Sequence, residues 1–423
     1  MMPSLVLTRR HILTTALAAG LAAPALVRAA RPSLRVGAIL PLAGGGLPLV
    51  GSNLSIPAEA ARKGLLIATE DLERATPAGT EPHRLLLANA PNAEPAQRAA
   101  ERLVERDGAT VLIGGFSAED AEAIGTVAQD AGALFINIAA PADALRSRFC
   151  GGNALHFEAA GSTYLSALHE LHAGQGRHRW HLIQQDDSTH ADLLVRAQNE
   201  LDRAGARIAG ISTVGGESVM FRRALSEACD SGADVALLLT DWLVQLNLLA
   251  TAESMKAELP ITGFPWAATQ TRDFYNRCRQ LAPTTGSAAR VALWEARVDR
   301  AEAAALSADF LARWRVPMDA SAWAAQAALR LTAQAADAVG ATGGRDLAAW
   351  MSDPTRAPAI GKDGASFDAA TGQLCQTLYA VRVDPAATSD LTPAAMTGRA
   401  ELLGLIEPRT TAAADCATAP RAG

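Results

Sequence analysis

Short apolar runs alternate with amphipathic segments along most of the chain. Apolar runs bounded by glycine or aspartate are typical of buried parallel strands, and apolar residues at helical spacing predict helices between them. A first series predicts strands at 34–42, 83–90, 109–115 and 133–140, with helices near 57–76, 94–108 and 118–131. A second series predicts strands at 179–185, 207–214, 233–240 and 259–264, with helices at 190–205, 218–231 and 242–257. Two such series, separated near residues 150–160, predict an α/β fold with two doubly wound parallel-sheet lobes.

The composition is that of a globular chain long enough for two hydrophobic cores. The 423 residues are 49% apolar and 19% charged, and the net charge is −6. No cationic stripe is visible along the sequence, which argues against a nucleic-acid partner. We expect a monomer. Five cysteines, none in a C-x-x-C pair, do not have the spacing of a zinc ribbon, and their odd number leaves at least one thiol unpaired.

The first residues resemble an export signal. Arg9 and Arg10 precede an apolar stretch from Ile12 to Val27, which is followed by the small residue Ala29 near the expected cleavage point. The Thr-Arg-Arg-x-Ile-Leu pattern resembles a twin-arginine signal, and Sec export is the alternative. The apolar stretch of 16 residues is shorter than the roughly 20 that span a bilayer. We therefore expect a signal peptide at 1–29, a periplasmic location and no membrane-embedded segment.

Open parallel sheets bind ligands outside the carboxyl ends of their strands, so the residues that follow each predicted strand are candidates for a binding site. Ser117 follows the third strand at the predicted N-cap of a helix. Its hydroxyl and the free backbone N–H groups of that turn suit an anion, above all a carboxylate. The other candidates at predicted strand ends are Ala139, Ala140, Asp187, Thr189, His190 and Asp241.

Three tryptophans suggest the shape of a ligand. Trp242 and Trp266 directly follow predicted strands, and Trp294 lies where the chain would cross back between the lobes. Indole rings that face a cleft would stack on a flat, conjugated ligand, and the alternative is that each ring packs a helix against a sheet. Arg290 and Arg297 flank Trp294 and would supply cations for an anionic ligand, unless they are solvated surface charges.

No pattern of an enzyme is found. The sequence lacks H-E-x-x-H, G-x-S-x-G and P-loop motifs. His169 and His172 are spaced for one helical face, where a solvated face is a better interpretation than a metal site. We expect neither a catalytic centre, nor a metal, nor a required cofactor.

Several stretches resemble type I periplasmic binding proteins, and within them the branched-chain amino acid group that feeds ABC transporters. The resemblance is carried by "LRVGAILPLAGG", "GATVLIGGFSAEDAEAIGTVAQDAGALFINIAAPAD", "WAAQAALRLTAQAADAV" and "GASFDAATGQLCQTLYAVRV". It implies two lobes joined by a hinge of three crossovers, near 155–158, 290–296 and 363–367, that close over a small molecule. The implied division is 30–156 with 296–364 for lobe 1, 157–295 with 365–385 for lobe 2, and a C-terminal extension at 386–423. The implied partner is an ABC permease, and a ligand sensor on the same fold is the alternative.

The family's ligand-holding positions match only in part. Ser117 matches the serine that amino-acid binders use after the third strand. Ala139 and Ala140 stand where the family has a threonine that holds the ammonium group, and Thr189 and His190 stand where it has Tyr-Gly. The resemblance therefore argues against an α-amino acid as the ligand.

The last third of the chain resembles the binding proteins associated with alcohol oxidation that depends on pyrroloquinoline quinone (PQQ). The stretches are "ALWEARVDR", "ADFLARWRVPMDASAWAAQAALR" and "GQLCQTLYAV". PQQ is a planar quinone with three carboxylates, which the Ser117 turn and the indoles would suit. This resemblance makes PQQ the leading candidate ligand, with an amino acid, an amide or an aromatic acid as alternatives.

Overall fold

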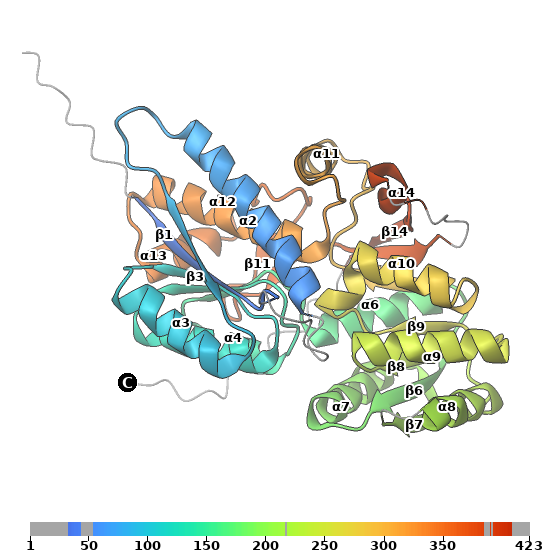
Figure 1. The fold of residues 1–423 in the computed structure, drawn as a ribbon. Coiled ribbons are helices and arrows are strands. Elements are labelled where there is room, and N and C mark those ends of the chain that lie inside the picture. Colours follow the sequence, from blue (N-terminus) through green and yellow to red (C-terminus); the bar gives the residue numbers. More distant parts are fainter. Residues whose placement is uncertain (1–32, 44–53, 216–217, 385–389, 391, 408–423) are drawn as a thin grey trace, which may run out of the picture.

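The computed structural model describes residues 33–43, 54–215, 218–384, 390 and 392–407. These residues form two lobes that lie side by side (Figure 1). The predicted signal peptide at 1–29 and the part of the predicted C-terminal extension beyond residue 407, with Cys416, lie outside the described residues. No helix in the described part of the chain is both long and apolar enough to cross a bilayer.

The first lobe is built on a five-stranded parallel sheet in the order β2-β1-β3-β4-β5. Helices α2 and α12 lie on one side of this sheet and α3 and α4 on the other (Figure 1). The strands are β1 (Arg35–Leu40), β2 (Arg84–Asn89), β3 (Val111–Gly114), β4 (Leu134–Asn137) and β5 (Ala154–His156). The helices are α2 (Ser55–Ala75), α3 (Ala93–Glu105), α4 (Ala118–Asp130), α5 (Ala144–Arg148), α12 (Ala320–Val339) and α13 (Gly344–Met351).

The second lobe repeats the arrangement with a four-stranded parallel sheet in the order β7-β6-β8-β9. Its strands are β6 (Arg179–Gln185), β7 (Arg207–Val214), β8 (Val235–Leu239) and β9 (Ile261–Gly263). Its helices are α6 (Gly161–Ala173), α7 (Ser188–Arg203), α8 (Ser218–Asp230), α9 (Trp242–Met255) and α10 (Arg272–Leu281), with the short 3-10 helix η1 (Ala267–Gln270). The predicted α/β class with two doubly wound lobes is confirmed.

A third, antiparallel sheet was not predicted from the sequence. It pairs β13 (Leu378–Val383) with both β10 (Ala289–Ala292) and β14 (Ala400–Ile406), and it lies beside the second lobe (Figure 1). Residues 400–406, assigned from sequence to a separate extension, are therefore a strand of the body. The remaining elements are η2 (Thr285–Ser287), α11 (Ala301–Trp314), β11 (Ser366–Phe367), β12 (Leu374–Cys375) and α14 (Pro393–Thr397).

The crossovers between the lobes follow from these pairings. The first runs from β5 to α6, and the second from β10 to α11. The hairpin of β11 and β12 stays with the first lobe, because Gln373 forms a bridge with His156 of β5. The chain thus crosses for the last time at 376–377, later than the predicted 363–367.

One histidine differs from its sequence interpretation, whereas the cysteines agree with the prediction that at least one thiol is unpaired. His172 is fully buried, with its ring edge-on to Trp180 at 5.4 Å between centroids, so it does not lie on a solvated face. Burial lowers the pKa of His172 to about 4. Cys150 is disulfide-bonded, while Cys229, Cys278 and Cys375 are free thiols.

Buried polar side chains tie the first two crossovers together. Glu158, in the first crossover, accepts a hydrogen bond from the Tyr164 hydroxyl at 2.6 Å. That hydroxyl accepts one from Gln270 Nε2 at 3.1 Å, and Gln270 Oε1 in turn accepts from the backbone N–H of Leu293 in the second crossover at 2.6 Å. Each of these side chains is buried, so each hydrogen bond replaces one that water would otherwise make.

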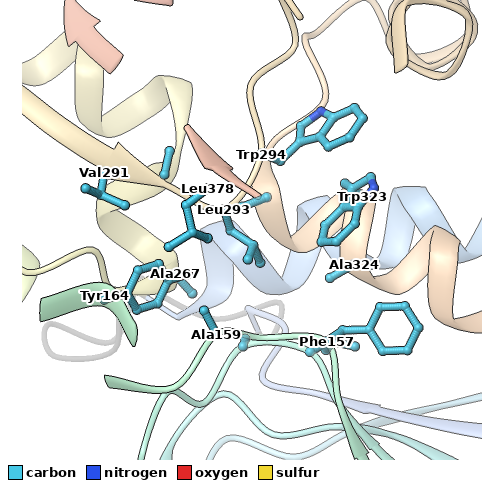
Figure 2. Packing of buried hydrophobic residues seen from close by; sticks show 14 of the residues in the cluster. Phe157, Ala159, Tyr164, Ala267, Val291, Leu293, Trp294, Trp323, Ala324 and Leu378 are labelled. Atoms are coloured by element: carbon cyan, nitrogen blue, oxygen red, sulfur yellow. The ribbon is translucent and has the colours of Figure 1, made fainter. Parts of the chain in front are cut away.

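Lys362 extends this network to the third crossover. Its ammonium group donates to Leu293 O at 2.5 Å, Gln376 Oε1 at 2.6 Å and Thr377 O at 3.0 Å. Gln376 Nε2 then donates to Phe157 O at 2.7 Å, next to Glu158. We call this closed set of residues the hinge ring; it consists of Glu158, Tyr164, Gln270, Leu293, Lys362 and Gln376. Figure 2 shows the apolar residues packed around it, among them Phe157, Ala159 and Leu378.

Burial shifts the titration of the hinge ring. Desolvation raises the pKa of Glu158 to about 7, against the opposing effects of the Tyr164 hydrogen bond and of the charges on Arg146 and Lys362. Desolvation likewise lowers the pKa of Lys362 well below its ordinary value. The folded chain thus holds a proton on Glu158 more tightly than the unfolded chain does.

This difference predicts a pH dependence of stability. A carboxyl whose folded pKa is raised contributes stability that is complete below its unfolded pKa of 4.5 and is lost as the pH rises through about 7. The shift corresponds to roughly 3 kcal/mol lost between pH 4.5 and 8. Glu158→Gln removes this titration, so we expect its urea-unfolding free energy to fall less over that range than that of the wild type. Glu105→Gln, at an exposed carboxyl on α3, is the control, and identical pH profiles for Glu158→Gln and the wild type would contradict the expectation.

Candidate functional site

Segments that follow strand ends in one lobe contact the other lobe. After β4, Pro141 O accepts a hydrogen bond from Gly161 N at 2.7 Å, and Asp143 accepts from the Ser162 N–H and hydroxyl at the start of α6. Asp143 also pairs with Arg196 of α7, at 3.1 Å between Nε and Oδ2. On the other side, η1 directly follows the β9 end and contacts α2 and α12. The carboxyl ends of both sheets are therefore turned toward the junction of the lobes.

The Ser117 turn is occupied by a carboxylate of the chain itself. Ser117 is the N-cap of α4, as predicted, and forms a capping box with Asp120. The Asp120 carboxylate accepts from the backbone N–H groups of Phe116, Ser117 and Ala121 and from the Ser117 hydroxyl, at 2.5–3.2 Å. Burial raises the pKa of Asp120, although these hydrogen bonds lower it. The groups expected to await a ligand anion are thus already bonded within the chain.

Ala139 and Ala140 form a buried turn after β4. Both backbone N–H groups donate to Asn137 Oδ1, at 3.3 and 3.0 Å, and Asn137 Nδ2 donates to Ala140 O at 2.8 Å. The two methyl groups belong to the hydrophobic cores of the first lobe. Their contribution is to shape the turn that carries Asp143 toward the second lobe.

An aromatic group lies at the strand ends of the second lobe. Trp266, directly after β9, packs on Phe264 at 4.6 Å between ring centroids and meets the edge of His190 at 5.7 Å. Its indole N–H donates to Thr240 O, at the end of β8, at 2.8 Å. The Trp266 ring remains half-buried, so it is packed yet still reachable. We call Trp266, Phe264, His190 and Asp187 the Trp266 group.

His190 supplies the polar atom of this group. Asp187 caps α7 by accepting from His190 N, and it also pairs with His190 Nδ1 at 2.7 Å. His190 Nε2 is buried and has no hydrogen-bond partner among the described residues. With Nδ1–H donating to Asp187, the neutral ring leaves Nε2 as an acceptor. The neighbouring Thr189 is exposed.

Asp241 and Trp242 lie at the end of β8. Asp241 caps α9 by accepting from Val244 N at 2.8 Å, and its own N–H donates to Gln185 Oε1. Trp242 is half-buried between Phe274, edge-on at 6.4 Å, and the Arg277 guanidinium, 5.4 Å from the ring centroid. Residues of α10 therefore cover part of this indole.

Arg290 and Trp294 are not brought to the Trp266 group. The Arg290 guanidinium is buried beneath α9 and α10, against the Phe274 ring at 5.2 Å. Trp294 is buried and stacked on Trp323, with ring centroids 5.4 Å apart and planes 7° apart (Figure 2). The core-packing alternative therefore describes Trp294, whereas Arg290 is buried and is not the solvated surface charge that was its alternative.

Arg297, the other arginine named from the sequence, and the neighbouring pair Arg222 and Arg223 of α8 also lie away from this group. Arg297 is exposed and donates to Ala400 O at 3.0 Å. Arg222 and Arg223 line a groove between α8 and α9 on the flank of the second lobe. Residues 44–53, which follow β1 outside the described residues, contain no lysine or arginine. The arginines named here are therefore not gathered at the Trp266 group, and the guanidinium groups at the segment after β4, those of Arg146 and Arg196, are bonded to oxygens of the chain itself.

Sequence reasoning missed some of the residues that support the strand ends and the junction of the lobes. Gln245 of α9, Tyr164 and Asp143 were not singled out, and Phe264 was counted only as the end of a predicted strand. The signal for Phe264 was available, because it stands between the β9 run and Trp266. No local pattern distinguishes Gln245 or Asp143 from surface residues, since their roles depend on contacts with distant segments.

Comparison with known proteins agrees with this architecture. A family model described as periplasmic binding protein matches residues 33–389. A branched-chain amino acid ABC transporter periplasmic ligand-binding protein from Burkholderia xenovorans is similar, with a TM-score of 0.75 at 16% identity over 89% of this chain and 96% of that one. A solute-binding protein from R. palustris in complex with benzoate has a TM-score of 0.69 at 19% identity over 89% and 97%.

A branched-chain amino acid transporter substrate-binding protein from Streptococcus pneumoniae in complex with isoleucine has a TM-score of 0.69 at 17% identity over 88% of this chain and 99% of that one. Among curated proteins, none matches the chain. At these identities the solved structures establish the fold, and the family model covers most of the sequence. The chain belongs to the periplasmic binding protein family.

Proposed function

We propose that this protein captures a small planar ligand between its lobes in the periplasm and delivers it to an ABC permease. The observation that carries the proposal is the Trp266 group at the strand ends of the second lobe. Trp266 has its N–H bonded to Thr240, so what it can still offer a ligand is the uncovered part of its half-buried ring. A ring face favours a flat, conjugated ligand by about 0.5–1.5 kcal/mol beyond the area it buries.

His190 gives the same site a polar contact. Its unpartnered Nε2 is held in orientation by Asp187 and is buried in this conformation; once uncovered, it would accept a hydrogen bond from a hydroxyl or N–H group of the ligand. Pairing this acceptor with the Trp266 face selects a planar molecule with a donor at its edge. Two of the similar solved proteins point to amino acids and to benzoate as classes to compare, because their names describe complexes with isoleucine and with benzoate.

Charge is the feature on which PQQ and smaller aromatic ligands differ. The planar ring of PQQ fits the stacking argument. Its three carboxylates would face the carboxylates of Asp120, Asp187 and Asp241, each of which stands at a helix N-terminus. Like charges repel, so we expect a neutral planar ligand to suit the described strand ends better than an anionic one.

A ligand panel tests the proposal by calorimetric titration of the mature protein. The panel contains PQQ, benzoate, its neutral counterpart benzamide, and isoleucine. We expect heat of binding from planar members, with benzamide tighter than benzoate, and none from isoleucine. Binding of isoleucine alone would contradict the planar-ligand proposal and return the protein to the amino-acid class.

Replacing the ring tests the role of Trp266. For the tightest ligand of the panel, Trp266→Ala should raise the dissociation constant by about 3- to 10-fold, the equivalent of one lost ring-stacking contact. Trp350→Ala, which removes a half-buried indole on α13 of the first lobe, is the matched control and should leave the affinity unchanged. Equal affinities for the wild type and both variants would remove Trp266 from the site.

Ser117→Ala separates capping from ligand binding. Loss of the cap should lower the free energy of unfolding by about 1 kcal/mol. Because the Ser117 hydroxyl is bonded to Asp120, we expect the affinity for the panel ligand to stay nearly unchanged. A loss of about tenfold in affinity would instead show that this hydroxyl holds a charged ligand group.

A further inference from the structure

A buried glutamine lies directly beneath the Trp266 group. Gln245, the fourth residue of α9, is fully buried. Its Nε2 donates to Thr240 O at 3.1 Å and to Phe264 O at 3.0 Å. Thr240 is the first residue after β8, and Phe264 is the first residue after β9. One amide group therefore joins the ends of two neighbouring strands.

The same two carbonyl groups hold Trp266. Thr240 O accepts from the Trp266 indole N–H at 2.8 Å, and Phe264 O accepts from the Trp266 backbone N–H at 3.0 Å. Gln245 therefore shares both acceptors with Trp266. A displacement of either carbonyl would move the ring, because its side chain and its backbone are attached to both.

Arg290 determines which way the Gln245 amide faces. Arg290 Nη1 donates to Gln245 Oε1 at 3.4 Å, a long contact that places a positive charge beside the amide oxygen. Two acceptor carbonyls lie on the opposite side of the same amide. An amide turned by 180° would direct its NH₂ group at the guanidinium and its oxygen at the carbonyls, so only one orientation is favourable. Arg290 Nε and Nη2 have no hydrogen-bond partner among the described residues, and the Phe274 ring covers the guanidinium.

The backbone is shaped to admit this side chain. A Cβ atom on Gly263, the last residue of β9, would lie 2.0 Å from Gln245 Oε1 and 2.6 Å from its Cδ. Any larger residue at 263 would expel the Gln245 amide from beneath the strand ends. The glycine, the glutamine and the arginine thus form one packed unit.

We propose that Gln245 is a positioning residue that fixes Trp266, and that Arg290 acts through it by orienting the amide. Arg290, which the sequence suggested as a ligand cation, then acts on the site without touching the ligand. That Gln245 and Arg290 fix the position of Trp266 does not depend on any ligand; the effect on ligand binding rests on the proposed function.

Fluorine NMR of protein labelled with 5-fluorotryptophan tests the geometric part without any ligand. Trp266→Phe identifies the Trp266 signal, and Trp350→Phe identifies a reference signal from the first lobe. In Gln245→Met, which keeps the volume but loses both donors, we expect the Trp266 signal to shift or split while the Trp350 signal stays. Gln326→Met, at another buried glutamine on α12, is the matched control and should leave the Trp266 signal in place.

A second variant covers the case in which Gln245→Met does not fold. Gln245→Glu preserves the shape and the contact with Arg290 but cannot donate to the two carbonyls when ionised, so the Trp266 signal should again shift. Acidification should return that signal toward its original position, since a protonated carboxyl can donate one of the lost hydrogen bonds. A Trp266 signal unchanged from wild type in the folded variants would overturn the proposal.

Calorimetric titration with the tightest ligand of the panel then distinguishes the geometric role of Gln245 from its effect on ligand binding. If Trp266→Ala weakens binding, Gln245→Met should weaken it by a similar factor, and undiminished affinity would overturn the link to binding. If no panel ligand binds, the proposed function fails while the NMR result still decides the role of Gln245.

Discussion

The hinge ring is the constraint on which the two-lobed structure depends. Three crossovers bring polar backbone groups into the interior, where each must find a partner because an unpaired buried group costs about 1–3 kcal/mol. Glu158, Tyr164 and Gln270 satisfy the first two crossovers, and Lys362 with Gln376 satisfies the third. As a consequence, ionisable groups of the hinge ring have pKa values far from their ordinary values. The stability of such a hinge therefore depends on the protonation state of its buried ionisable groups.

A second constraint explains the character of the strand ends. Exposed N–H groups at helix N-termini attract anions, and in many proteins that attraction binds a ligand. Here the chain satisfies it internally, with Asp120 on α4, Asp187 on α7 and Asp241 on α9. The helix ends are stabilised, and the attraction is no longer available to a ligand anion. Under the proposed function, recognition would then depend on ring faces and on His190.

The fold was predictable because its information is local. The strands at 179–185 and 207–214 were placed to the residue, since each apolar run is closed by turn residues and followed by a helical pattern. The antiparallel sheet was missed because its three strands come from separate parts of the chain. The sequence of residues 400–406 does not indicate that they pair with β13.

For the candidate site residues, the sequence predicted local positions but not contacts. Sequence patterns placed Ser117 at a cap and Trp266 at a strand end, and both stand there. They could not show that Asp120 fills the turn, or that Trp294 stacks in the core on Trp323, because these contacts depend on packing between distant segments.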